Sequence, residues 1–126
     1  SATTSALEAI VADHNARMTY AEVEKASRSV ALHVLRRMID KRKKENGGSS
    51  KELVVVVMME KGWRQVVAVL GCLRAQAAYL PMDPKLPTQR QQHIISASGA
   101  TLVLVDEAGM SMGSWLHEHP DLLMVF

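Results

Sequence analysis

The sequence is poor in several residue types on which binding and redox chemistry depend. Its 126 residues include one cysteine, two tryptophans, two tyrosines and one phenylalanine. The single cysteine, Cys72, cannot form an internal disulfide, and its position among apolar residues favours a small buried side chain over a reactive thiol. So few aromatic rings provide no stacking platform for single-stranded nucleic acid. We therefore expect an aliphatic core, a reducing compartment and no nucleic-acid partner.

The sequence also lacks an excess of charge of one sign and a long apolar run. Lysine and arginine number 15 and acidic residues 13, a net charge of +2, which does not by itself indicate a polyanionic partner. No apolar segment approaches the ~20 residues that cross a bilayer. No charged-then-apolar signal segment opens the sequence. We expect a cytoplasmic protein with no membrane partner.

Recognisable catalytic motifs are absent as well. There is no G-x-x-x-x-G-K-[ST] loop and no G-x-G-x-x-G after a strand, so no phosphate cradle can be identified. The histidines provide one close pair, His117 and His119, which we interpret as surface helix residues because no cysteine lies at zinc-site spacing. Ser96, Ser98 and Ser111 have neither a nucleophile elbow nor a base at recognisable spacing.

The pattern of apolar residues predicts an α/β fold with a mainly parallel sheet and flanking helices. The segment LVVVVMM at 53–59 is typical of a parallel strand buried on both faces. Further strands are expected at 78–82, 101–105 and 122–126, and helices at 62–74, 87–97 and 111–119. Ile94 and Ile95 should be the main buried residues of the second of these helices. Strands alternating with helices predict right-handed βαβ units over 53–126.

A β-hairpin and a long amphipathic helix are expected before these units. The hairpin spans 8–19 with Asn15 at its tip, and Thr19 and Glu22 form a capping box for a helix over 20–44. The apolar residues that recur at three- and four-residue spacing predict its buried face; they are Val23, Ala26, Val30, Val34, Leu35, Met38 and Ile39. A flexible loop is expected at 45–51. The whole chain, 1–126, reads as one compact unit.

A basic cluster, RRMIDKRKK, ends the long helix at 36–44. It admits a nuclear-signal or phosphate-binding interpretation. The favoured interpretation is a solvated helix end, because cations there complement the helix dipole and because Met38 and Ile39 interrupt the cluster. Binding of a nucleotide or another anion by this segment remains a weaker hypothesis.

Four carboxylates follow predicted strands and are the candidate site residues: Glu60, Asp83, Asp106 and Glu107. In open α/β sheets, ligands bind outside the carboxyl ends of the strands. Loop polarity and turn formation explain the same residues equally well, and for Asp83 before Pro84 the turn is favoured. We therefore assign no catalytic, cofactor-binding or metal-binding residue in this chain.

Three motifs give the chain a family resemblance. The segment LRAQAAYLPMDP at 73–84 resembles the L-K-A-G-x-A-Y-x-P-x-D-P signature of nonribosomal peptide synthetase adenylation domains, which belong to the adenylate-forming enzymes. MTYAEV at 18–23 resembles their earlier L-T-Y-x-E-L signature, and MEKG at 59–62 stands where the family has E-R-S after a strand. Together they resemble the N-terminal portion of such a domain, and so imply part of the N-terminal subdomain of that fold.

Two residues of the first motif constrain its structure. Pro81 lies within a predicted strand, so it should occupy a sheet edge, a bulge or the strand end, where its missing N–H is not needed. Gln76 replaces a family glycine. Either the backbone angles there suit a residue other than glycine, or this passage is rearranged. The polar segment 42–51 is also longer than the turn expected from the family.

The resemblance implies a parent enzyme that joins an amino acid or another carboxylic acid to ATP as an acyl adenylate. ATP and Mg would be its cofactors, and the acyl group would pass to phosphopantetheine on a carrier protein. The family motifs that bind these groups come later in the domain and are not found here. We therefore expect this chain to be an inactive scaffold, with the remainder of the domain and the carrier protein as partners.

One alternative belongs to another class. The chain could be a stand-alone, non-catalytic interaction module that reuses the scaffold and binds a protein through exposed apolar surface. If the chain is instead a truncated scaffold, self-association or poor solubility is expected, because the strands at 53–59 and 122–126 would lack full cover.

Overall fold

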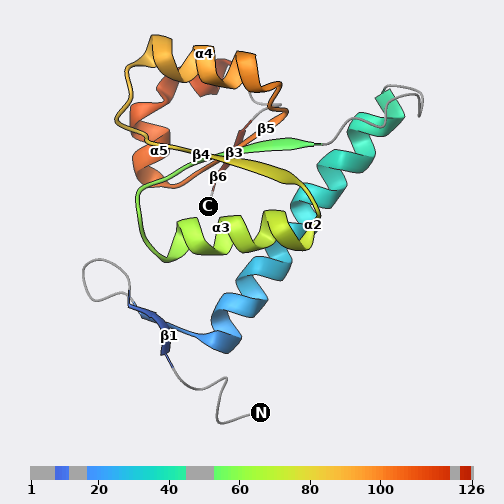
Figure 1. The fold of residues 1–126 in the computed structure, drawn as a ribbon, viewed down its shortest axis with the longest axis vertical. Coiled ribbons are helices and arrows are strands. Elements are labelled where there is room, and N and C mark those ends of the chain that lie inside the picture. Colours follow the sequence, from blue (N-terminus) through green and yellow to red (C-terminus); the bar gives the residue numbers. More distant parts are fainter. Residues whose placement is uncertain (1–7, 12–16, 45–52, 120–122, 126) are drawn as a thin grey trace.

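The computed structural model describes residues 8–11, 17–44, 53–119 and 123–125 (Figure 1). Strand β1 (Glu8–Val11) pairs antiparallel with β2 (Arg17–Thr19), and helix α2 (Tyr20–Lys44) follows directly. The predicted hairpin tip at Asn15 and the loop at 45–51 lie outside the described residues.

The start of α2 is capped by Thr19. The Thr19 hydroxyl oxygen accepts a hydrogen bond from the Glu22 backbone N–H at 3.1 Å, as predicted. The Glu22 side chain, however, accepts a bond from the Thr19 hydroxyl at 3.1 Å, and the expected bond to the Thr19 backbone N–H is not the one formed. The capping box therefore consists of two hydrogen bonds of the Thr19 hydroxyl, one accepted from the Glu22 backbone N–H and one donated to the Glu22 side chain.

A four-stranded parallel sheet forms the centre of the molecule, which confirms the α/β fold class. Its order is β4-β3-β5-β6. The strands are β3 (Val54–Met58), β4 (Ala78–Met82), β5 (Leu102–Val105) and β6 (Leu123–Val125). The connections are α3 (Trp63–Arg74), α4 (Thr88–Ser98), and α5 (Glu107–Met112) followed by the 3₁₀ helix η2 (Ser114–Glu118).

Helices cover both faces of this sheet. Figure 1 shows α2 and α3 on one side and α4 and α5 on the other. Alternate residues of β3 supply the two resulting cores: Val55 and Val57 pack with α2 and α3, while Val56 and Met58 pack with Ile95 of α4 and with η2. These four side chains have no exposed surface. The expectation that 53–59 would lack cover was wrong, because the chain's own helices supply both layers.

The buried face of α2 differs from the prediction. Val30 and Val34 are buried as expected, but Leu35 and Ile39 are 40% and 53% exposed. The face that meets α3 includes the small residue Ser27, which is fully buried although it is polar. Helical spacing was compatible with two neighbouring apolar stripes, and the crossing with α3 covers only one of them.

The later helices differ from their predicted bounds in detail. The helix expected at 111–119 is two elements, because Asp106 caps an earlier helix and Gly113 ends it. Pro87 is the N-cap of α4, one position before the helix, and Gly99 ends α4 in the left-handed conformation. On α3, Leu73 is 55% exposed.

Pro81 lies in β4, the edge strand of the sheet, as its missing N–H required. The Ala78 N–H donates to the Leu53 carbonyl at 3.0 Å, across to the chain leading into β3. Because backbone groups alternate in direction along a parallel strand, those of Tyr79 and Pro81 face away from β3. Proline is therefore tolerated at this position without the loss of a ladder hydrogen bond.

Gln76 occupies the left-handed position of a tight helix end. Its φ is 58°, and it is the only non-glycine residue with positive φ in the described part of the chain. The Ala77 N–H donates to the Cys72 carbonyl at 3.0 Å, and the Gln76 N–H donates to the Leu73 carbonyl at 3.1 Å. This pair of bonds is a Schellman motif, whose central position is usually glycine. Of the two alternatives, the tight turn is retained and Gln76 adopts its angles.

Replacing Gln76 with glycine is expected to stabilise the chain by about 0.5–1 kcal/mol, because glycine carries no Cβ penalty in the left-handed region. Urea unfolding of the two proteins measures the difference. Gln76→Ala is the matched control, because alanine retains the Cβ and should give no gain. Equal stabilities of the glycine variant and the parent chain would contradict the interpretation.

Cys72 lies fully buried in α3, and this burial raises the pKa of its thiol to about 11. Below pH ~9 the thiol is protonated in both folded and unfolded chains, so its contribution to stability is fully present. Between about 9 and 11 only the unfolded chain releases the proton, so stability falls as pH rises. We expect a steeper loss of unfolding free energy over this range in the parent chain than in Cys72→Ala. Parallel pH profiles would contradict it.

Candidate functional site

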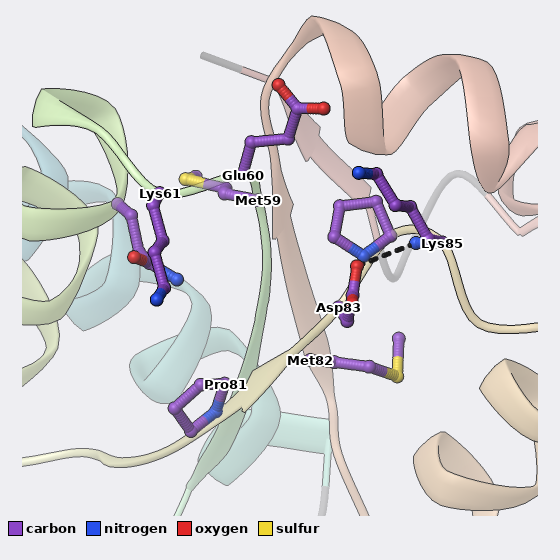
Figure 2. Close-up of a pocket in the computed structure, with 9 residues that line it drawn as sticks. Met59, Glu60, Lys61, Pro81, Met82, Asp83 and Lys85 are labelled. Atoms are coloured by element: carbon purple, nitrogen blue, oxygen red, sulfur yellow. Dashed lines mark hydrogen bonds between the residues drawn. The ribbon is translucent and has the colours of Figure 1, made fainter. Parts of the chain in front are cut away.

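A hollow lies at the carboxyl ends of β3 and β4. Its volume is about 530 Å³. It is lined by Met59, Glu60 and Lys61 after β3, by Gln65 of α3, and by the segment 81–85 at the end of β4 (Figure 2). This is the edge of a parallel sheet where ligands of open α/β proteins bind, and the volume is that of a small-molecule site.

The structure brings two of the four candidate carboxylates to this pocket. Glu60 and Asp83 line it from adjacent strands, whereas Asp106 and Glu107 do not. Glu107 lies in the first turn of α5 and is exposed. Two of the four strand-end carboxylates therefore lie at the hollow, and they are its two acidic lining residues.

Asp106 has a structural role. Its Oδ1 accepts a hydrogen bond from the Gly109 N–H at 2.7 Å and its Oδ2 accepts one from the Glu60 N–H at 3.1 Å. The carboxylate is nearly buried, with 8% of the residue exposed. It therefore caps α5 and ties the end of β5 to the segment that leaves β3.

Asp83 forms the turn that its position before Pro84 favoured. Its Oδ1 accepts a hydrogen bond from the Lys85 N–H at 2.9 Å, two residues on, which is an Asx turn. The Leu86 N–H also donates to the Asp83 carbonyl at 3.2 Å. The turn interpretation of Asp83 is confirmed, and the turn forms one wall of the pocket.

Gln91 is a structural residue of this wall that the sequence did not indicate. Gln91 is fully buried in α4. Ile94 of the same helix, which was predicted to be buried, is only half-buried. The Gln91 Nε2 donates to the carbonyls of Pro84 at 2.9 Å and Leu86 at 3.0 Å, while its Oε1 accepts from the Trp115 indole N–H at 2.8 Å. The sequence feature that could have indicated its burial is its position one helical turn before Ile95, which is also buried.

The other sequence candidates lie elsewhere. His117 and His119 are exposed in and after η2, and Ser98 Oγ donates to the Ile95 carbonyl at 3.0 Å. In the part of the chain that the structure describes, no group of three or more His, Cys, Asp or Glu residues could hold a metal ion. Among those same residues, no helix has the length and apolar character needed to cross a bilayer.

The chain is similar to known proteins in sequence and in fold. The sequence profile of the family described as AMP-binding enzyme matches residues 1–122. The chain is 36% identical over 96 residues to the nonribosomal peptide synthetase-like enzyme fsqF of Aspergillus fumigatus, covering 76% of this chain and 6% of that protein. It is 35% identical over 96 residues to cyclosporin synthetase simA of Tolypocladium inflatum, covering 75% and 1%. The chain thus spans only a small part of these relatives.

The fold is also similar to that of solved structures. The AMPPNP-bound form of the nonribosomal peptide synthetase FmoA3 superposes with a TM-score of 0.73 and 28% identity, over 98% of this chain and 12% of that one. Apo MatB from Rhodopseudomonas palustris superposes with a TM-score of 0.68 over 96% of this chain and 22% of that one. Its identity is 19%, so this second likeness concerns the fold alone.

Proposed function

Because this chain belongs to the AMP-binding enzyme family, we propose that it is the N-terminal scaffold of a longer enzyme that activates a carboxylic acid as an acyl adenylate. The resemblance of 73–84 to an adenylation-domain signature is confirmed by the relatives of peptide synthetase type. The observation that carries the proposal is the family match over 1–122, joined to the FmoA3 superposition over nearly the whole chain. The scaffold is that of an adenylating enzyme.

An amino acid is the substrate class that the peptide synthetase relatives favour, and a carrier-protein thiol is the acceptor that they favour. In the proposed reaction the carboxylate attacks the α-phosphorus of ATP and pyrophosphate leaves. Mg and cationic groups would neutralise the phosphate charge in that step. The described residues of this chain do not fit these groups, since they contain neither a metal-ligand cluster nor a glycine-rich phosphate loop. We therefore assign none of the reaction steps to them.

Pyrophosphate exchange into ATP tests the proposed activity. The longer protein that contains this sequence is incubated with labelled pyrophosphate, ATP, Mg and each amino acid in turn, followed by other small carboxylic acids. Exchange with one acid or a few is expected, over a control without acid. The 126-residue chain alone should show none. Exchange by the chain alone would overturn its role as scaffold, and no exchange by the longer protein would overturn the adenylating function.

The size of the native polypeptide tests whether a longer protein exists. An antibody raised against this chain should detect a band several times heavier than 13.9 kDa in extracts of the source cells. A band at 13.9 kDa would instead favour the stand-alone interaction module.

Self-association through α2 remains a proposal of ours for the isolated chain. Leu32, Leu35 and Ile39 form an exposed apolar stripe there, with 49%, 40% and 53% of each residue exposed. A second copy would cover this stripe if the two helices packed antiparallel, because Glu24 near one end would then approach the basic residues Arg42 and Lys43 near the other. Sedimentation should show a concentration-dependent dimer that Leu35→Gln weakens. A stable monomer at high concentration contradicts the proposal.

A further inference from the structure

The exposed surface of helix α2 carries an inference that does not rest on the adenylating function. We propose that the second half of α2 is the docking surface for an acidic amphipathic helix of a partner protein. The apolar side chains of that helix would cover the stripe of Leu32, Leu35 and Ile39. Its carboxylates would pair with the basic residues that border the stripe.

The apolar stripe lies on the side of α2 that the rest of the chain does not cover. Leu32, Leu35 and Ile39 follow one another at spacings of three and four residues, so they form one continuous row. Between 40% and 53% of each residue is exposed. The helix α3 packs on the opposite side of α2, where Gly71 meets Val30. Figure 1 shows the last turns of α2 standing apart from the other helices, so the described elements leave the stripe open.

Exposed basic residues border the stripe. Arg36 lies four residues after the first residue of the stripe, and Arg42 and Lys43 lie three and four residues after the last, spacings that make them surface neighbours of it. Among the described residues, these three side chains have no ion-pair partner. Asp40 is a nearby carboxylate, but residues 36–52 contain seven basic and three acidic residues. This excess of positive charge favours a partner that carries carboxylates.

The combination of apolar and basic residues distinguishes an acidic helix from other polyanions. A nucleic acid would match the cations and leave the apolar side chains in contact with water. A bilayer surface is less suited, because the stripe is about 10 Å long and lacks the tryptophan or phenylalanine typical of interfacial helices. An acidic amphipathic helix carries apolar residues at the same helical spacing, with carboxylates beside them, and so matches both parts of the surface.

A second copy of this chain matches the surface less well. Its Glu24 would approach Arg42 and Lys43, but that carboxylate already pairs with Arg28 of its own helix. Each copy would also bring its own basic segment to the interface, and like charges oppose association. The acidic helix should therefore bind in preference to a second copy and displace it.

Titration of the ¹⁵N-labelled chain with a synthetic acidic peptide tests the proposal. The peptide has about 15 residues, enough for a helix that covers the stripe and its cations, with leucines at three- and four-residue spacing and glutamates beside them. The chain is kept at a concentration where sedimentation shows a monomer. We expect saturable shifts of the amide signals of residues 32–43, with half-saturation at about 100 μM or below.

Two variants of α2 separate the apolar and the charged contributions. Leu35→Gln should weaken the binding about fivefold or more, because it removes apolar surface that the peptide would cover. Arg42→Gln/Lys43→Gln should weaken it about fivefold or more at low salt and less at high salt, because the pairs that it removes are screened. The matched control is Arg74→Gln/Arg90→Gln, which removes two exposed cations from α3 and α4 and should leave the affinity unchanged.

Two changed peptides complete the test. One has glutamine in place of every glutamate, the other has serine in place of every leucine, and each should bind more weakly than the acidic amphipathic peptide. The proposal is overturned if that peptide does not bind at about 1 mM, if the shifts lie outside α2, or if the α3 and α4 control variant loses affinity to the same extent. Tighter binding of α2 to phosphatidylserine vesicles or to single-stranded DNA would overturn it in favour of a membrane or a nucleic acid. A dimer that the peptide does not displace would overturn it in favour of a second copy.

Discussion

Gly109→Ala is expected to lower the free energy of unfolding by about 3 kcal/mol or more, at the upper end of the cost of overpacking. A Cβ at this position would collide with the Met58 carbonyl oxygen and lie 3.0 Å from the Val105 Cβ. Both neighbours belong to central strands of the sheet, so neither can move away cheaply. The same substitution disturbs the Gly109 N–H that Asp106 accepts at 2.7 Å.

Urea unfolding followed by far-UV circular dichroism measures this loss, and the soluble yield provides a second readout if the variant does not fold. Ser111→Ala is the matched control. It lies in the same short helix, is exposed, and should change the stability by less than about 0.5 kcal/mol. A Gly109→Ala variant as stable as this control would show that α5 does not approach β3 as closely as described.

Gly71→Ala should have the second largest effect, a loss of about 1–3 kcal/mol. Gly71 lies where α3 crosses α2, and a Cβ there would collide with the Val30 Cγ1, 2.6 Å from the Val30 Cβ and 3.2 Å from the Ser27 carbonyl oxygen. The nearest atoms belong to a β-branched side chain, which has few rotamers available in a helix. The two helices must therefore separate to admit the methyl group.

Val30→Ala provides the test of this mechanism. Alone it destabilises the chain, because it removes two buried methyl groups. Combined with Gly71→Ala it should cost less than the sum of the two single changes, because each relieves the other. Thermal unfolding of the four proteins gives this interaction free energy, and strict additivity would contradict a direct contact between the two positions.

The sheet could be predicted from sequence because its signals are local. A run such as 53–59 is apolar at every position, short and rich in valine, which is typical of a strand buried on both faces, and the observed β3 differs by one residue at each end. The parallel order follows from the alternation of strands with helices. Helix ends were less predictable. Asp106 was read as the end of a strand, although it begins a helix through a bond to the Gly109 N–H.

The predictions that were wrong concern contacts between elements that lie far apart in the sequence. Leu35 and Ile39 share helical spacing with the buried Val34, and only the direction of α3 decides which stripe is covered. Gln91 satisfies two carbonyls of a turn and one indole N–H, a network that no local pattern encodes. The sequence has carboxylates at the strand ends where the pocket lies, but no site was assigned to them, and the residues that hold the walls of the pocket in place could not be predicted.

Pro81 in the edge strand β4 also determines at which edge of the sheet a further strand can pair. A strand added beside β4 needs outward donors as well as acceptors, and Pro81 removes one of them, leaving the Tyr79 N–H as the one donor between Ala78 and Met82 on that side. A neighbouring strand would therefore be held by an incomplete ladder. An additional strand is better accommodated beside β6, at the other edge of the sheet, so the sheet can extend in one direction.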